Sequence, residues 1–97
     1  MIKEDIVKDT SLITTQVSSL SGNVTIAAGE SVDMTFDVSK NGYTPIGIVG
    51  WYFDPYYANI SRITSITDTT ITLRLANWRD ASINVSNRSI RVLYVKK

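Results

Sequence analysis

The pattern of hydrophobic and polar positions divides the chain into two regions that meet near Ser21 and Gly22. From Asn23 onward the apolar residues recur with a period of two, which places alternate side chains on opposite faces of a strand. Residues 31–38 show this best, because apolar and polar side chains alternate there without exception. We therefore predict a series of short strands, most with one buried and one exposed face.

Turn residues separate these strands at intervals of about 8 to 12 residues, a spacing typical of an antiparallel sandwich. After Tyr56 and Tyr57, Ile60, Ile63 and Ile66 follow one another at a spacing of three, which implies a bulge if this segment is a strand. The other predicted strands are residues 23–28, 31–38, 43–53, 69–76, 81–85 and 89–95. The predicted fold class is all-β: a small antiparallel β-sandwich of six or seven strands with a short N-terminal arm or helix.

Two predicted strands, 43–53 and 89–95, are apolar on both faces. A sandwich of this size should keep one face of each sheet in water, so the surplus apolar surface predicts a subunit interface. Gly47 and Gly50 indicate a bulge or a close backbone approach in the first of these strands. The interface candidates from the two strands are Ile48, Val49, Leu93 and Val95.

The first 20 residues carry a weak heptad pattern. Ile6, Ile13 and Leu20 recur every seven residues, and Val17 occupies the complementary position. Such a short helix needs sibling chains or a docking partner, and its Thr and Ser residues suit an extended arm equally well. We predict an anchoring or oligomerisation arm over residues 1–22 and a β-sandwich module over residues 23–97. A homotrimer is the expected assembly, and a monomer whose edge strands are covered by its own arm is the alternative.

Composition narrows the range of functions. The 97 residues include no Cys and no His, which removes Cys/His metal sites, disulfides and histidine-dependent triads. We expect no cofactor, no metal and no catalysis, since the carboxylates lack the spacing of a catalytic pair. The net charge of +1 and the scattered basic residues argue against a nucleic-acid partner. Without a long apolar run or an export signal, we expect synthesis in the cytoplasm and no membrane insertion.

Aromatic residues near Asp54 and in a later loop have the composition of a sugar-binding surface, where flat rings stack on pyranose faces. In the alternative interpretation, the two tryptophans fill the core or a subunit interface while the tyrosines surround it. The candidate glycan-binding residues are Trp51, Tyr52, Tyr56, Tyr57, Trp78, Arg79 and Asp80.

Four segments carry a family resemblance: GYTPIGIVGW from Gly42 to Trp51, an Asn-Ile pair at Asn59, ITLRLAN ending at Asn77, and VLYVK from Val92 to Lys96. Together they resemble the C-terminal module of tailed-bacteriophage fibre and virion-decoration proteins. The resemblance implies a trimeric β-sandwich on a virion, as a head fibre, a decoration protein or a short tail-fibre knob. Anchoring of the N-terminal arm to a capsid or tail protein fits this resemblance, and the candidate glycan-binding residues would then contact host-surface glycans. A free-standing carbohydrate-binding module or adhesin is the alternative function.

Overall fold

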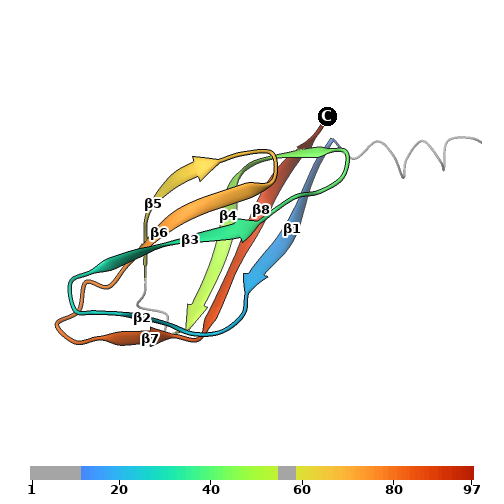
Figure 1. The fold of residues 1–97 in the computed structure, drawn as a ribbon. Helices are drawn as coiled ribbons and strands as arrows, with labels where there is room; N and C mark the ends of the chain where they lie inside the picture. The colour runs from blue at the N-terminus through green and yellow to red at the C-terminus, as the bar shows by residue number, and fades with distance from the viewer. Residues whose placement is uncertain (1–11, 55–58) are drawn as a thin grey trace, which may run out of the picture.

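A computed structural model describes residues 12–54 and 59–97, which form eight strands and no helix (Figure 1). The strands are β1 (Ile13–Leu20), β2 (Val24–Ile26), β3 (Ser31–Asp37), β4 (Tyr43–Asp54), β5 (Asn59–Ile66), β6 (Thr70–Ala76), β7 (Ile83–Val85) and β8 (Asn87–Lys96). Every pairing between them is antiparallel. The predicted all-β class is confirmed.

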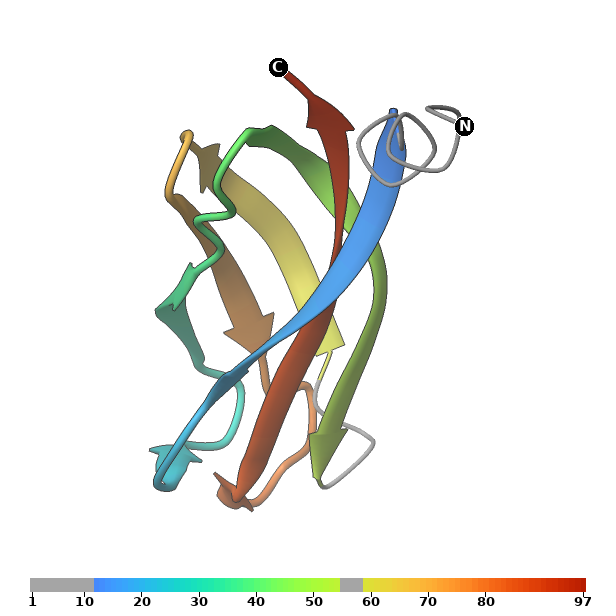
Figure 2. The ribbon, with the colours of Figure 1, turned by 90° about the vertical axis from the view of Figure 1, so that its right-hand side faces the viewer.

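The strands form two three-stranded sheets and one short pair. Sheet A has the order β1-β8-β4, sheet C has the order β3-β6-β5, and β2 pairs with β7 beside them. Sheets A and C lie across from each other as two layers, which gives a sandwich-like arrangement (Figures 1 and 2). Contacts between β1 and β3 and between β4 and β5 join the two layers along their sides.

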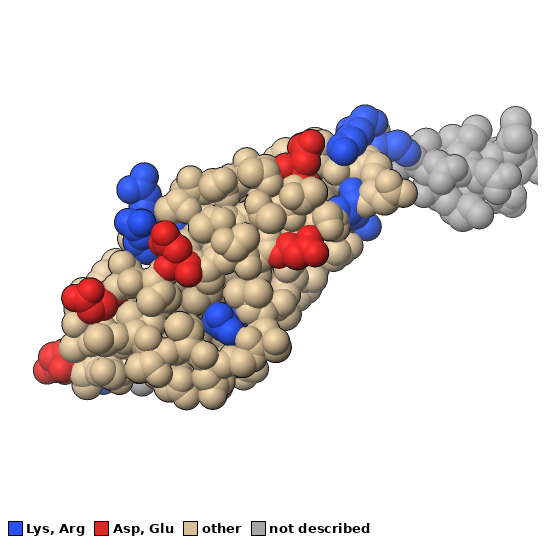
Figure 3. Space-filling model, viewed as in Figure 1, with Lys and Arg blue, Asp and Glu red and all other residues tan. Residues whose placement is uncertain are grey.

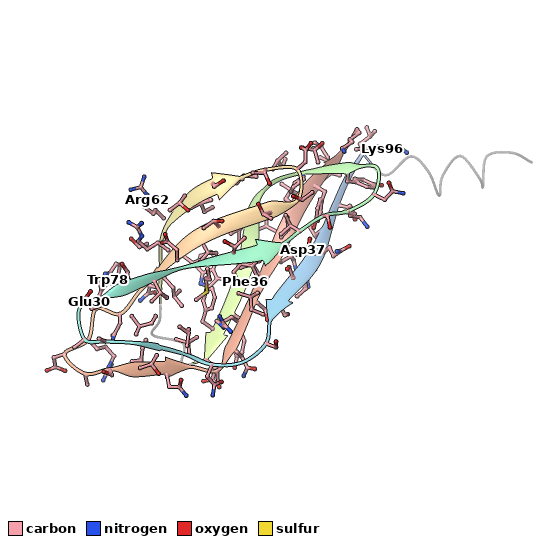
Figure 4. All side chains as sticks on the ribbon, viewed as in Figure 1. Glu30, Phe36, Asp37, Arg62, Trp78 and Lys96 are labelled. Atoms are coloured by element: carbon pink, nitrogen blue, oxygen red, sulfur yellow. The ribbon has the colours of Figure 1, made fainter. Side chains whose placement is uncertain are left out.

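The core lies between the central strands of the two layers. The alternating apolar residues of β3 and β6 face inward from sheet C, and those of β8 face inward from sheet A. Phe36, which is fully buried, points from β3 into this space (Figure 4). The other fully buried apolar side chains are Ile26, Val38, Ile71, Leu73, Leu75, Val85, Ile90, Val92 and Tyr94.

Two buried polar side chains connect loops to this core. The Asn77 side chain at the end of β6 is fully buried, and its Nδ2 group lies within hydrogen-bonding distance of three backbone carbonyls, those of Ile26 (2.9 Å), Ala27 (3.2 Å) and Ala81 (2.8 Å). The Tyr94 hydroxyl donates to the Val38 carbonyl at 2.7 Å. A buried polar group without a hydrogen-bond partner destabilises the folded state, so both side chains depend on their carbonyl acceptors being in place.

The N-terminal segment is extended where the structure describes it. Residues 13–20 form β1, which pairs along its whole length with β8 in sheet A. Of the two alternatives left open for the first 20 residues, the extended one therefore holds for this part. Ile13 and Val17 point to one face of the strand and Leu20 to the other, whereas Ile6 lies outside the described residues.

Strands β4 and β5 each contain two irregularities of register. In β5 they leave Ser61 and Thr64 without an opposite residue in the register with β6. As a result, Ile60, Ile63 and Ile66 all pair with inward-facing residues of β6. This confirms the bulge implied by the spacing of three. In β4 the shifts lie between Pro45 and Gly47 and between Ile48 and Gly50, as the two glycines indicated.

Candidate interaction surface

The outer face of sheet A is the most apolar exposed surface that the register assigns to one side of the sandwich. Residues paired across an antiparallel sheet share a face, so the pairings of β1, β8 and β4 define its rows. From one end to the other, these rows are Ile13, Val95 and Thr44; Thr15, Leu93 and Gly47; Val17, Arg91 and Gly50; and Ser19, Ser89 and Tyr52. We call this set the outer A face.

Exposure of apolar side chains on this face is high for a single chain. Ile13 is 63% exposed and Val17 is 48% exposed, while Leu93 and Val95 are half-buried between their neighbours. Arg91 is the one charged residue in the four rows, and its Nη1 group donates to the Thr15 hydroxyl at 3.2 Å. The face therefore combines exposed apolar groups with very little charge, which is typical of the centre of an interface.

Gly47 and Gly50 adjoin the two bulges of β4, but no steric contact within the described residues requires glycine at either position. Neither has a positive φ, and a Cβ atom at Gly47 would meet nothing within 4 Å. A Cβ atom at Gly50 would make only an ordinary contact with Arg91 Cβ at 3.7 Å. Glycine within a strand costs stability and often marks the approach of another backbone or a ligand. The bare backbone of β4 thus leaves room above the outer A face.

A shallow groove of about 310 Å³ occupies the half of the face that lies toward Tyr52. It contains two exposed aromatic residues, a cation and a hydroxyl, and no carboxylate. Its lining residues are Val17, Gly50, Trp51, Tyr52, Ser89, Ile90 and Arg91. This set can offer ring faces for stacking and donors for hydrogen bonds.

The structure gathers most of the predicted interface residues. Ile13, Val17, Leu93 and Val95 share the outer A face, and Val49 is 53% exposed as the extra residue of the second β4 bulge. Leu20 and Ile48 instead pack against the core from the inner side. They turn inward because each lies one strand position out of phase with the outward residues.

The predicted glycan-binding residues are not brought together as one set. Trp51 and Tyr52 line the groove, whereas Trp78, Arg79 and Asp80 lie in the loop after β6 and do not line it. Trp78 is 72% exposed and lies near Glu30, whose carbonyl accepts from the backbone N–H of the preceding Asn77 (Figure 4). Tyr56 and Tyr57 fall outside the described residues. Neither tryptophan is a core residue, because both are more than half exposed.

The outer face of sheet C has the opposite character. Asp33 and Arg74 form an ion pair at 2.9 Å, and the Thr35 and Thr72 hydroxyls are joined by a hydrogen bond of 2.9 Å. The hydrogen bond from Arg74 lowers the pKa of the Asp33 carboxyl below its ordinary value. Acidic and basic side chains are interspersed over the side seen in Figure 3, without a large area of one sign. This polar face is suited to solvent.

Sequence reasoning missed two features of these surfaces. Arg91 was counted among scattered basic residues, although its position two residues before Leu93 on an alternating strand could have placed it on the same face. Ile63 and Ile66 face the inner side of sheet C, yet each remains 40% exposed. They lie on an edge strand whose inner side is incompletely covered, and the sequence carries no signal for that coverage.

The described residues hold no group of three or more Asp or Glu side chains that could bind a metal ion. Within the same residues, no helix is long and apolar enough to cross a membrane. Comparisons with protein-family models, with curated proteins and with solved structures found no match to the chain.

Proposed function

We propose that this chain is a structural, self-associating β-sandwich module displayed on the surface of a bacteriophage particle, as a head-fibre or decoration protein or as a short tail-fibre knob. The observation that carries the proposal is the outer A face, an exposed apolar surface on the side of sheet A that faces away from the core. The segment Gly42 to Trp51, on which the family resemblance rests, supplies much of β4 at one edge of that face. The function is thus assembly and display without catalysis.

The physical case for self-association rests on the apolar surface that a single chain leaves exposed to water on the outer A face. A monomer leaves Ile13 and Val17 about half exposed or more, and nothing within the described residues covers them. Burying apolar surface yields about 25 cal/mol per Å² removed from water, so a second subunit on this face would be stabilising. The family resemblance favours three copies about one axis, and a twofold contact would give two copies. The heptad spacing supports neither arrangement, because residues 13–20 form a strand.

The absolute mass of the full chain in solution tests the proposal. Size-exclusion chromatography with light scattering should give the mass of a defined oligomer that falls to a monomer on dilution. A monomer at every protein concentration would refute self-association. Mass spectrometry of purified particles from the source strain then tests the location, because a virion protein must copurify with the particle at a fixed stoichiometry.

A second candidate function is carbohydrate binding, as a free-standing module or adhesin, and the groove favours it. Tyr52 is 58% exposed on the outer A face and lines the groove together with Arg91, so its ring can stack on a sugar. Isothermal titration with a panel of bacterial surface oligosaccharides tests this candidate. Tyr52→Ala should abolish binding, and Trp78→Ala, which alters a more exposed aromatic residue outside the groove, is the control. Equal loss in both variants would contradict a site in the groove.

A further inference from the structure

Each three-stranded sheet of the sandwich ends in two edge strands. These are β1 and β4 in sheet A and β3 and β5 in sheet C. An edge strand presents unpaired backbone N–H and C=O groups to any other strand that approaches. Proteins normally block such edges with proline, charge or bulges, so an edge without these features is informative.

Three of the four edges are blocked in recognisable ways. Strand β4 contains Pro45 and two bulges, and β5 contains two bulges and Arg62. Strand β3 has no bulge, but Asp33 and Asp37 point outward from it. A second copy of β3 approaching its own edge would therefore meet like charges. The bent or charged edges of these strands disfavour the addition of another strand.

Strand β1 has none of these features. Its sequence ITTQVSSL contains no charge and no proline, and all eight of its residues pair with β8 in an unbroken register. Its contacts with sheet C are made by side chains: the Ser18 hydroxyl donates to the Asp37 carbonyl at 2.7 Å, and Lys40 Nζ donates to Gln16 Oε1 at 3.3 Å. The backbone of the free side of β1 is not used by either contact.

The backbone pattern identifies which groups are open. The Lys96 N–H donates to the Leu12 carbonyl at 2.8 Å, so residue 12 directs its backbone toward β8. Hydrogen-bonded pairs alternate along an antiparallel ladder, so residues 14, 16, 18 and 20 also face β8. The N–H and C=O groups of Ile13, Thr15, Val17 and Ser19 therefore point away from the sheet. Within the described part of the chain, no hydrogen bond engages these groups.

We propose that the free edge of β1 pairs with β1 of a second copy of this chain, antiparallel and about a twofold axis, so that two A sheets join into one continuous six-stranded sheet. This inference rests on the proposed self-association and names the contact that produces it. A twofold contact brings each residue near its own copy or near a residue of the same strand. Because β1 carries no charge, self-pairing meets no like-charge repulsion, unlike pairing through β3.

The side chains of β1 also match in this arrangement. With Thr15 on the axis, Ile13 lies opposite Val17 of the partner subunit, and the same pairing recurs on the other side of the axis. Residues 13, 15 and 17 then share about six backbone hydrogen bonds with the partner. Ile13 and Val17, exposed in the single chain, cover each other on the joined outer A faces. Apolar cross-strand pairs of this kind stabilise sheets.

The size of the contact sets its strength. Eight residues of strand extend about 26 Å, so the edge alone buries well under the roughly 800 Å² per partner of a stable interface. We therefore expect a dimer that dissociates on dilution. Local crowding of copies on a particle surface would favour the paired state.

The test is the mass of the full chain over a wide range of protein concentrations, with two matched variants. Val17→Lys places a charge at the β1 edge, and Val49→Lys places the same charge on β4 at a valine of similar exposure, 53% against 48%. The inference predicts a dimer for the wild type and for Val49→Lys, and a monomer for Val17→Lys. Circular dichroism checks that each variant is folded.

Hydrogen exchange on the wild-type protein gives a second readout that needs no variant. The amides of Ile13, Thr15 and Val17 should become more protected as protein concentration rises. A trimer, or an oligomer lost in Val49→Lys but kept in Val17→Lys, would overturn edge pairing while leaving self-association standing. A wild-type monomer at all concentrations would overturn both edge pairing and self-association. The same holds if the edge of β1 binds a strand of another protein instead.

Discussion

Asn77 offers the sharpest test of how this sandwich is held together. Its side chain is fully buried and contacts three separate segments: the end of β2, the loop before β7 and its own turn. Two variants probe it: Asn77→Ala removes every side-chain hydrogen bond, and Asn77→Asp keeps the oxygen that accepts from the Arg79 N–H. Asn84→Ala is the control, because Asn84 is an exposed asparagine on the neighbouring β7.

The expected magnitude follows from the bonds. Nδ2 has two hydrogens for its three carbonyl contacts, and Oδ1 accepts one N–H, so Asn77→Ala removes the equivalent of about three hydrogen bonds. Each contributes about 1 kcal/mol net, which gives a loss of about 3 kcal/mol in the free energy of unfolding. For a domain of this size, that corresponds to a fall in Tm of about 12 to 24 °C.

Asn77→Asp should be more destabilising than Asn77→Ala at neutral pH. It replaces a donor with a buried anionic oxygen that faces carbonyl oxygens, so the folded state raises the pKa of the introduced carboxyl. A folded pKa raised above the unfolded value means that stability is retained at low pH and lost as pH rises. The deficit of Asn77→Asp relative to Asn77→Ala should therefore shrink on acidification.

Urea unfolding followed by far-ultraviolet circular dichroism measures these differences, provided that the slope m is the same for all variants. Asn84→Ala should lie within about 0.5 kcal/mol of the wild type, as expected for an exposed site. If Asn77→Ala also lay within that margin, the three-segment connection would not be a stabilising feature, and the reasoning would be wrong.

Two further predictions concern titrating groups. Tyr94→Phe leaves the Val38 carbonyl without its donor and should cost about 1 to 2 kcal/mol. Burial raises the pKa of Tyr94, so wild-type stability should fall as pH rises above the ordinary pKa of tyrosine. Tyr94→Phe should not show this loss, and urea unfolding of both proteins at alkaline pH measures the difference. The hydrogen bond from Arg74 lowers the pKa of Asp33, so its contribution to stability is present at neutral pH and lost on acidification. In a carboxyl NMR titration, Arg74→Gln should return the pKa of Asp33 toward its ordinary value and leave that of Asp37, which is lowered by the Ser39 backbone N–H, unchanged.

The strands after residue 23 could be predicted because the period-two pattern there reflects one buried face. Residues 31–38 alternate without exception, and β3 covers residues 31–37. Strand β1 could not be predicted in the same way, since its inner positions Thr14, Gln16 and Ser18 are polar. It forms a strand because β8 supplies a complete hydrogen-bonding partner, and the tertiary contact overrides local preference.

The candidate surface could be predicted only in part, because exposure depends on how much a small core can cover. The two apolar faces of residues 89–95 indicated surplus surface, and the register places Leu93 and Val95 on the outer A face. The same argument placed Ile48 outward, but a bulge shifts the phase of β4 and turns it toward the core. A pattern of period two cannot give the number of bulges that precede a residue.

The irregularities of period therefore carry information about assembly as well as about register. In β5 the spacing of three among its isoleucines arises from two bulges, and in β4 two more accompany the glycines. Each bulge bends an edge and disfavours strand addition there. Strand β1 has a continuous register and no charge, so it is the only one of the four edges with neither a bulge nor a charged residue. The weak hydrophobic pattern of β1 thus belongs to the edge strand whose backbone is most open to pairing with a second copy of the chain.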